Sequence, residues 1–176
     1  MAQEFLIKTA RLSLRPLRGA DRDVVVDLIN DYDISRWLTV VPYPYGAADF
    51  DAFLAYLADK PAHENLAIIA DGQPVGMIGI DASLGYWLGH AHQGHGYMTE
   101  AATALIDWYF ATTDAEHLRA GHFDDNAASR AVLTRLGFLP EGEGMVSSIA
   151  QGRDVLMKNT RLSRADWDAQ QAPARR

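Results

Sequence analysis

Four stretches of the chain carry apolar residues at intervals of three and four positions, the period of a helix that buries one face. The last of these stretches has clear end signals. Asp125 and Asn126 precede it and are good N-caps, and Gly137 follows it, where a left-handed residue is favoured. We therefore predict four helices, over residues 24–32, 50–57, 101–112 and 128–136.

Short apolar or alternating runs lie between these helices and predict β-strands. Asp71-Gly72, a dipeptide typical of tight turns, joins two of the runs into a hairpin, and Ala82-Ser83 turns the chain back into a third. The order of strands, meander and helices indicates a mixed α/β sheet. The predicted strands cover residues 11–17, 66–70, 74–80, 84–88, 118–123 and 154–159.

Length and composition indicate one globular domain. The chain has 176 residues, 48% of them apolar, without an internal repeat, so we expect a single domain over residues 1–160 and a polar C-terminal tail over residues 161–176. No apolar stretch approaches the roughly 18 residues that indicate a membrane span, and no signal peptide is recognisable. We expect a cytoplasmic protein without membrane contact, as a monomer or homodimer.

The net charge and the absence of cysteine reduce the number of function classes that fit this chain. The 16 Lys and Arg residues against 23 Asp and Glu residues give a net charge of −7, which disfavours nucleic acid as a partner because binding phosphates needs a basic face. A negatively charged protein is compatible with an acceptor that carries a cationic amine. Without any cysteine, the chain has no disulfide, no thiolate nucleophile and no cysteine-based metal site.

A glycine-rich turn follows the strand predicted at 84–88 and leads into a helix. Gly94 and Gly96 allow successive backbone N–H groups to converge, and the helix start adds free donors, which suits a phosphate or a pyrophosphate. A tight turn without a ligand is the alternative. A Walker loop is excluded because none of the three lysines ends such a turn. A dinucleotide fingerprint lacks its third glycine, since Thr99 stands there.

Three separated segments resemble the GNAT superfamily of acyl-CoA-dependent N-acyltransferases, in the branch that contains the ribosomal-protein N-terminal acetyltransferases. The opening Thr9-Ala-Arg-Leu-Ser-Leu-Arg-Pro-Leu17 is similar to the first strand of that branch. The segment from Gly85 through Gln93-Gly-His-Gly-Tyr-Met-Thr-Glu-Ala101 is similar to its coenzyme A loop, and Asn126 to Phe138 to its second cofactor helix. Together the segments extend the resemblance from residue 9 to about residue 160.

The resemblance implies the acyl-CoA N-acyltransferase fold, a central mixed, mostly antiparallel sheet with splayed central strands and about four flanking helices. It also implies acetyl-CoA as cosubstrate and no metal, with the pyrophosphate on the loop amides and the pantetheine arm along a strand edge. Met98 departs from the usual glycine or alanine, so we expect its side chain to point into the core. The cofactor-binding residues expected are Tyr86, Trp87, Leu88, Gly94, His95, Gly96, Tyr97, Met98, Thr99, Asn126 and Ser129.

The implied reaction is transfer of an acetyl group to a primary amine, on a protein N-terminus or a small molecule, by direct attack in a ternary complex. Many family members protonate the leaving thiolate with a tyrosine where this chain has Leu133. The ribosomal-protein branch instead places a serine three residues after the helix-opening asparagine, and the resemblance implies that Ser129 hydrogen-bonds or protonates the sulfur. Glu100 is the second catalytic candidate, although the helix dipole also explains an acidic residue in a first turn. We expect a backbone N–H of Leu88 or Gly89 to face the thioester oxygen.

Other roles and functions stay open. One alternative function is an acyl-CoA-binding sensor without catalysis, and another is a metal hydrolase built on three clustered histidines. The metal-hydrolase motif requires an aspartate at position 94, where this chain has Gly94. Candidates for the general base are His63, His90, His92, His122 and Asp124, and candidates for walls of the acceptor cleft, or for core packing, are Trp37, Tyr43, Tyr45 and Tyr86.

Overall fold

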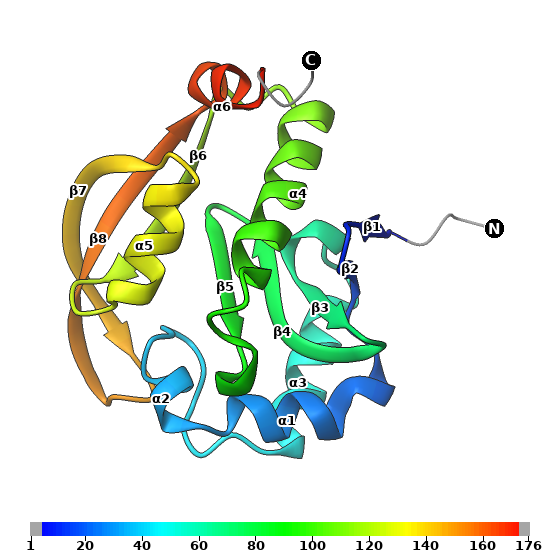
Figure 1. Cartoon of the computed structure of the whole chain (residues 1–176). Helices are drawn as coiled ribbons and strands as arrows, with labels where there is room; N and C mark the ends of the chain where they lie inside the picture. Colours follow the sequence, from blue (N-terminus) through cyan, green and yellow to red (C-terminus); the bar gives the residue numbers. More distant parts are fainter. Residues whose placement is uncertain (1–4, 173–176) are drawn as a thin grey trace.

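One eight-stranded sheet, in the order β1-β2-β3-β4-β5-β6-β8-β7, runs through the computed structural model, which describes residues 5–172 (Figure 1). Neighbouring strands are antiparallel except β5 and β6. The mixed α/β class with a mostly antiparallel sheet is therefore confirmed. The strands are β1 (Ile7–Lys8), β2 (Leu12–Pro16), β3 (Leu66–Ala70), β4 (Gln73–Ile80), β5 (Leu84–Leu88), β6 (His117–Phe123), β7 (Leu139–Ser148) and β8 (Arg153–Ser163).

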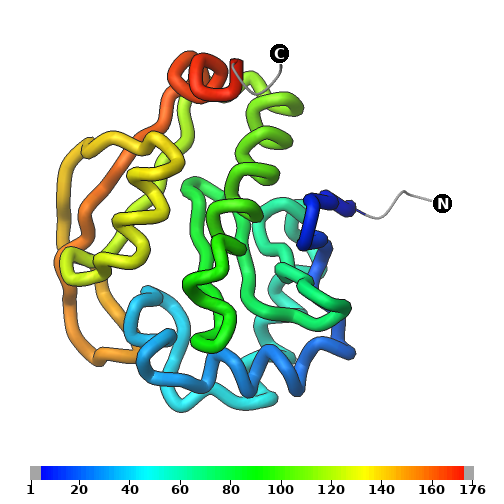
Figure 2. Tube along the Cα trace, viewed as in Figure 1, coloured from blue at the N-terminus to red at the C-terminus, as the bar shows by residue number. Residues whose placement is uncertain are grey.

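Helices cover both faces of the sheet, with α4 and α5 on one face and α1 and α3 on the other (Figures 1 and 2). No helix between residues 5 and 172 has the length and apolar character needed to cross a membrane. The α-helices of the described residues are α1 (Arg22–Ile29), α2 (Tyr32–Ser35), α3 (Ala47–Leu57), α4 (Tyr97–Thr112), α5 (Ala127–Arg135) and α6 (Arg164–Gln171); single 3-10 turns are η1 (Gly19–Asp21), η2 (Ala62–Glu64) and η3 (His90–His92).

Two apolar cores sandwich the sheet, and β3 contributes to both because successive side chains of a strand point to opposite faces. Leu66 and Ile68 are fully buried under the face that carries α4 and α5. Ala67 and Ile69 are buried under the face that carries α1 and α3. A strand buried on both sides lies in the centre of the fold and holds the N-terminal half of the sheet rigid.

The sheet opens between β5 and β6. These parallel strands share one bridging pair, Leu84 with Ala120, and then separate toward their C-terminal ends (Figure 1). The splayed central strands that the resemblance implies are thus confirmed. The gap divides the molecule into an N-terminal half, with β1 to β5, and a C-terminal half, with β6, β8, β7 and α5.

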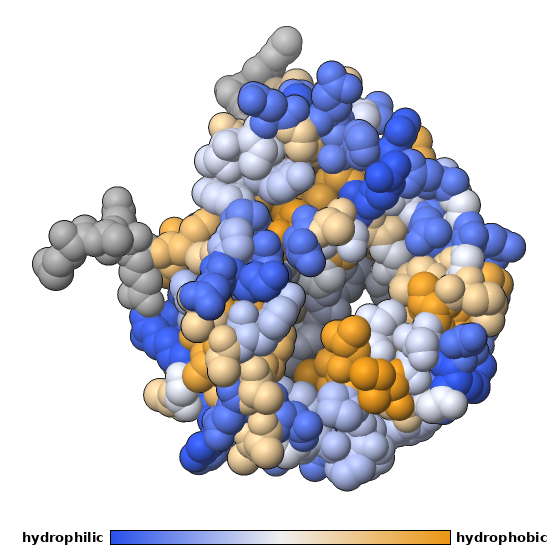
Figure 3. All heavy atoms as spheres, turned by 180° about the vertical axis from the view of Figure 1, so that it is seen from behind, coloured by the Kyte–Doolittle hydropathy of each residue, from blue (hydrophilic) through white to orange (hydrophobic). Residues whose placement is uncertain are grey.

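The two halves meet again at the far end of the gap. The turn between β7 and β8 donates its Ile149 backbone N–H to the Thr39 carbonyl at 2.9 Å and its Gln151 side-chain amide to the Arg36 carbonyl at 2.7 Å. Contacts therefore bound the gap at both ends, and Figure 3 shows the surface hollowed between the two halves.

Two long elements in the C-terminal half, β7 and α6, lie where the sequence pattern predicts none, and so does the short strand β1. β7 is an exposed edge strand, and α6 follows β8 inside the segment expected to be a polar tail. The indole of Trp167 on α6 is 2% exposed and donates to Asp107 on α4 at 2.9 Å. The packed domain therefore continues beyond the boundary expected at residue 160.

Candidate active site

A turn with two left-handed glycines connects η3 to α4. Gly94 and Gly96 have φ angles of 76° and 77°, which glycine adopts without strain. The first helical bond of α4 runs from the Glu100 N–H to the Gly96 carbonyl at 3.0 Å. Within residues 5–172, no protein group accepts a hydrogen bond from the N–H groups of residues 94–99. These donors lie at the positive end of a 16-residue helix and can bind an anion.

Met98 fits this turn in the way expected. Its side chain is 6% exposed and belongs to the core under α4, so only its backbone faces the turn. The departure from a small residue therefore changes core packing and leaves the N–H available. The neighbouring Tyr97 ring stacks on His95 at 5.7 Å between ring centres.

Arg11, at the start of β2, holds the turn from the side. Its Nη1 donates to the His95 carbonyl at 2.9 Å, and its guanidinium carbon lies 4.8 Å from the centre of the Tyr97 ring. The positive charge beside the open N–H groups strengthens their attraction for an anion. The sequence reasoning missed this residue as a site residue, although it is part of the opening segment that carries the resemblance.

Glu100 anchors α4 to the β1–β2 connection. Its carboxylate accepts from the Thr9 hydroxyl at 2.6 Å, from the Arg11 backbone N–H at 2.9 Å and from the Arg11 Nε at 2.7 Å. Burial raises the pKa of Glu100, but the hydrogen bonds from Thr9 and Arg11 and the charge of Arg11 together hold it below its ordinary value. These contacts explain the residue as a structural anchor, and its catalytic role stays a prediction.

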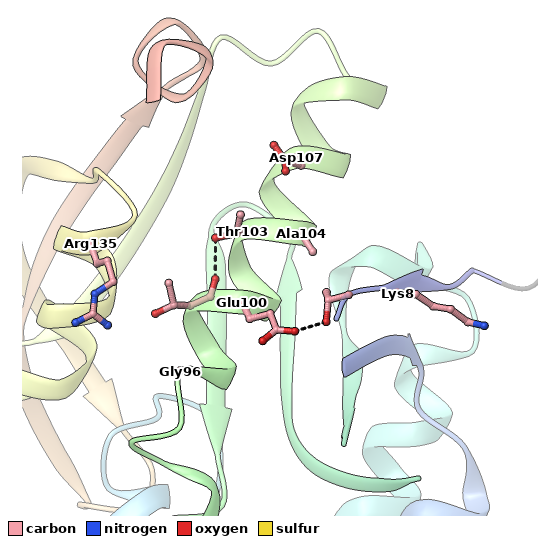
Figure 4. Close-up of a pocket in the computed structure, with 9 residues that line it drawn as sticks. Lys8, Gly96, Glu100, Thr103, Ala104, Asp107 and Arg135 are labelled. Carbon is pink, nitrogen blue, oxygen red and sulfur yellow. Dashed lines mark hydrogen bonds between the residues drawn. The ribbon is translucent and has the colours of Figure 1, made fainter. Parts of the chain in front are cut away.

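A cavity of about 580 Å³ borders the first turns of α4 (Figure 4). Arg135 of α5 lines one side of it, across the space between α4 and α5, and Lys8 lies on the opposite side with its amine directed away. This volume is typical of ligand pockets. The lining residues are Lys8, Thr9, Gly96, Thr99, Glu100, Thr103, Ala104, Asp107 and Arg135.

Tyr86 and Ser129 meet across the splayed strands. The Tyr86 hydroxyl of β5 lies 2.9 Å from the Ser129 hydroxyl in the first turn of α5. Burial raises the pKa of Tyr86 to about 12, against the opposing effect of the bond to Ser129, so the phenol stays protonated at neutral pH. Asn126 holds this turn as N-cap, because its Oδ1 accepts from the Ser129 N–H at 3.0 Å.

The free edge of β5 presents backbone groups to the gap. Gly89 donates its N–H to the Val75 carbonyl at 2.9 Å, so the prediction that Gly89 offers a free N–H is wrong. Backbone groups alternate in direction along a strand, and the groups of Tyr86 and the N–H of Leu88 therefore face the gap. The Leu88 carbonyl accepts from the Gln93 side chain at 3.1 Å. Trp87, one residue out of phase, pairs with Met77 of β4.

The candidate bases lie in different places. His63 packs on Trp108 at 5.0 Å between ring centres, away from the gap, and His90 is exposed. His92 lies half-buried in η3. Asp124 pairs with Lys158 at 3.5 Å. His122 is buried on β6. Among the described residues, no three histidine or acidic side chains converge as a metal site would require.

The aromatic candidates divide between core and surface. Tyr45 is 7% exposed and packs in the core with α1 and α3, whereas Tyr43 is 46% exposed and contacts Tyr32 at 5.2 Å between ring centres. Trp37 packs on Phe123, at the end of β6, at 6.4 Å. Trp37 and Tyr86 therefore lie on segments that border the gap, and Tyr45 belongs to the core.

The sequence and the fold are both similar to those of known proteins. The model of the acetyltransferase (GNAT) domain matches residues 11–139. The chain is 28% identical to uncharacterized N-acetyltransferase p20 of Bacillus licheniformis, over 85% of this chain and 92% of that protein. It is 36% identical to [ribosomal protein uS5]-alanine N-acetyltransferase of Escherichia coli, over 48% and 43%. The fold superposes on Mycobacterium smegmatis RimJ in complex with CoA-disulfide, with a TM-score of 0.79, 20% identity and coverage of 98% and 96%.

Proposed function

Because this chain belongs to the GNAT family of acetyltransferases, we propose that residues 94–99 bind the diphosphate of acetyl-CoA and that the acetyl group passes to a primary amine. The observation that carries this proposal is the run of N–H donors without a protein acceptor at the start of α4. A diphosphate fits such a run because it offers several negatively charged acceptors to one convergent set of donors. The Arg11 guanidinium, which is ion-paired with Glu100, lies beside the turn and holds it through the His95 carbonyl.

The edge of β5 suits the pantetheine arm of the same molecule. Its amides can pair with the backbone N–H and carbonyl of Tyr86, as a peptide pairs with an exposed strand, which leaves the Leu88 N–H for the reacting thioester. Asn126 keeps its side-chain amide group free for the ligand, since its Oδ1 serves the α5 cap. Trp87 supports the strand from the opposite face, where it packs with the core under α1 and α3.

In the proposed reaction the amine nitrogen attacks the thioester carbon, so a C–N bond forms and the C–S bond breaks. The Leu88 N–H donates to the oxygen on which negative charge develops. Within the Tyr86–Ser129 pair one hydroxyl donates to the other, and the second donates its own hydrogen bond to the departing sulfur. A phenol with a pKa of about 12 keeps its proton beside a thiolate, whose conjugate thiol ordinarily has a pKa near 8.5, so this pair stabilises the thiolate without protonating it.

The acceptor is a primary amine, on a protein N-terminus or a small molecule. The net charge of −7 favours an approaching cationic amine. The printed name of the Escherichia coli relative, which specifies an alanine of ribosomal protein uS5, supports a protein N-terminus. Peptides with ribosomal-protein N-termini are therefore the first acceptors to test, followed by polyamines and amino acids.

Two measurements test the proposal together. Calorimetric titration of the purified chain with coenzyme A is expected to show one site, and thiol release from acetyl-CoA is expected to rise above background with at least one amine of the panel. Arg11→Gln is expected to weaken the binding, because it removes the charge beside the turn. Absence of coenzyme A binding would overturn the proposal. Binding without turnover on any amine would identify an acyl-CoA-binding sensor instead.

A further inference from the structure

We propose that His122 accepts the proton that the attacking amine loses, an inference that rests on the proposed function. His122 is the only histidine of residues 5–172 that is buried, with 7% of its surface exposed. It stands on β6 immediately before the strand ends, on the side of the gap opposite β5. A buried titratable side chain at the splay point is available to the reaction and has no structural explanation in the apolar core.

The strand register brings His122 level with Tyr86. Leu84 and Ala120 form the one bridge between β5 and β6, and Tyr86 and His122 each follow two residues later. Because side chains alternate along strands, both point to the face of the sheet that α4 and α5 cover. Leu84, Ala120 and Tyr86 all belong to the core on this face. The imidazole therefore borders the same part of the gap as the Tyr86–Ser129 pair.

One ring nitrogen of His122 is fixed by the backbone. Nδ1 lies 2.9 Å from the Phe123 carbonyl, which can only accept a hydrogen bond, so in the neutral ring Nδ1 carries the hydrogen and Nε2 the lone pair. Nε2 has no protein partner among the described residues. Ser35 Oγ is the one fully enclosed side-chain polar atom there without a partner. Nε2 is therefore not fully enclosed, and we place the amine, or a water that relays its proton, at this nitrogen.

The other candidate bases are engaged elsewhere. Glu100 is saturated by Thr9 and Arg11, and Asp124 is half-exposed and paired with Lys158. The charged groups nearest to His122 along the chain and across the sheet are Asp124, two residues later, and Lys158, its register partner on β8. Glu143 of β7 also pairs with Lys158. Lys158 offsets one of these two carboxylate charges, and Tyr86 across the gap stays neutral.

His122 alone can carry the one proton that moves from the amine to the sulfur in this reaction. The neutral amine attacks, a C–N bond forms, and the nitrogen gives one proton to Nε2 of His122. The C–S bond breaks and the sulfur leaves with its electron pair, held by Ser129 and Tyr86. The imidazolium then returns its proton to the thiolate, either directly or through water, which leaves amide and free thiol and restores the neutral ring.

The test compares His122→Gln with His117→Gln, an exposed histidine at the other end of the same strand. We expect His122→Gln to lower kcat by about 10²- to 10⁴-fold, the usual contribution of general acid–base catalysis, with coenzyme A affinity and Tm near wild type. His117→Gln is expected to match wild type in all three. His122→Asn serves as a second variant if glutamine weakens coenzyme A binding.

The pH profile separates a proton acceptor from a packing residue. Two groups of the wild type, amine and imidazole, must be deprotonated, so log kcat/KM should fall at acid pH with a limiting slope of two. The variant should show a slope of one, from the amine alone. A variant with wild-type kcat, or with the slope of two retained, would overturn the role of His122 while acetyl transfer stands. A wild type without turnover would instead overturn the proposed function.

Discussion

Tyr86 and Ser129 are 2.9 Å apart between their hydroxyl oxygens, although the first lies on the last strand of the N-terminal half and the second on α5 of the C-terminal half. This bond spans the opening of the sheet. It holds two hydroxyl groups at the level where β5 and β6 have separated, and so places hydrogen-bond donors at the centre of the proposed reaction.

Tyr86→Phe and Ser129→Ala should each lower kcat by roughly 2- to 12-fold, the equivalent of about 0.5–1.5 kcal/mol for one neutral hydrogen bond. The coenzyme A dissociation constant should stay near wild type. The double variant should cost little more than either single one, because each change already removes the pair. Steady-state kinetics of the four proteins give the answer, with Tyr56→Phe as an exposed control. Fully additive losses would show that the two hydroxyls act independently.

Gly94→Ala should weaken coenzyme A binding by about 5- to 30-fold. No atom lies within 4 Å of the added methyl group, but its φ of 76° costs an L-residue about 1–2 kcal/mol, so the turn relaxes away from the geometry that aligns the N–H groups. Gly152→Ala is the matched control, with a φ of 61° and equally open space in the β7–β8 turn. Both variants should lose similar stability, and calorimetry should find weaker binding in the first alone.

Glu100→Gln should reduce stability and acetyl-CoA affinity while kcat stays within about threefold of wild type. The amide cannot replace a carboxylate that accepts from Thr9 and Arg11. Since the folded pKa of Glu100 is lowered, its stabilising effect is complete above its ordinary value of 4.5 and is lost as pH falls through the lower folded value. Wild type should therefore lose more stability than the variant below pH 4.5 in thermal scans. A loss of kcat of about 10²-fold or more would instead favour proton transfer by Glu100.

Asp21→Asn should destabilise the fold by about 3–5 kcal/mol, because it removes the carboxylate charge from a largely buried ion pair with Arg15. The two residues share two hydrogen bonds of 2.8 Å, and Asp21 is 5% exposed. Urea unfolding measures the change, and Asp23→Asn, whose side chain is 93% exposed, should be nearly neutral.

The same pair predicts a pH dependence. Burial raises the pKa of Asp21, but the hydrogen bonds from Arg15 and Arg18 and their charges lower it further than burial raises it. The stabilisation is therefore present above the ordinary value of 3.8 and disappears as pH falls below it. Unfolding experiments should show that Asp21→Asn removes this part of the acid sensitivity. An unchanged acid transition would contradict it.

Elements with a buried apolar face were predictable from the sequence, and elements held by other means were not. The four helices and the Asp71-Gly72 hairpin follow from periodicity and turn chemistry. β7 begins Leu-Pro-Glu-Gly-Glu-Gly and shows no alternation, because its side chains are exposed and the β8 backbone holds it in place. α6 is polar apart from the buried Trp167, so its sequence resembles a tail.

The site divides in the same way. Its turn could be located because two closely spaced glycines and a helix start are local features of the sequence. The Tyr86–Ser129 bond and the contact of Arg11 with the turn join segments more than 40 residues apart, so they depend on tertiary packing. Gly89 was misjudged because its partner, Val75, is fixed by the pairing of β4 with β5. The sequence therefore predicts which chemical groups a segment carries, whereas the hydrogen-bond partners of those groups depend on the tertiary structure.

The bonds from Ile149 and Gln151 to residues 36–39 give the opening a complete frame. If the amine enters through this opening, as the proposed function requires, a chain end or a slender side chain can be inserted into it more easily than a polypeptide can be laid across it. The frame would then favour acceptors whose amine protrudes over acceptors whose amine lies flat on a folded surface.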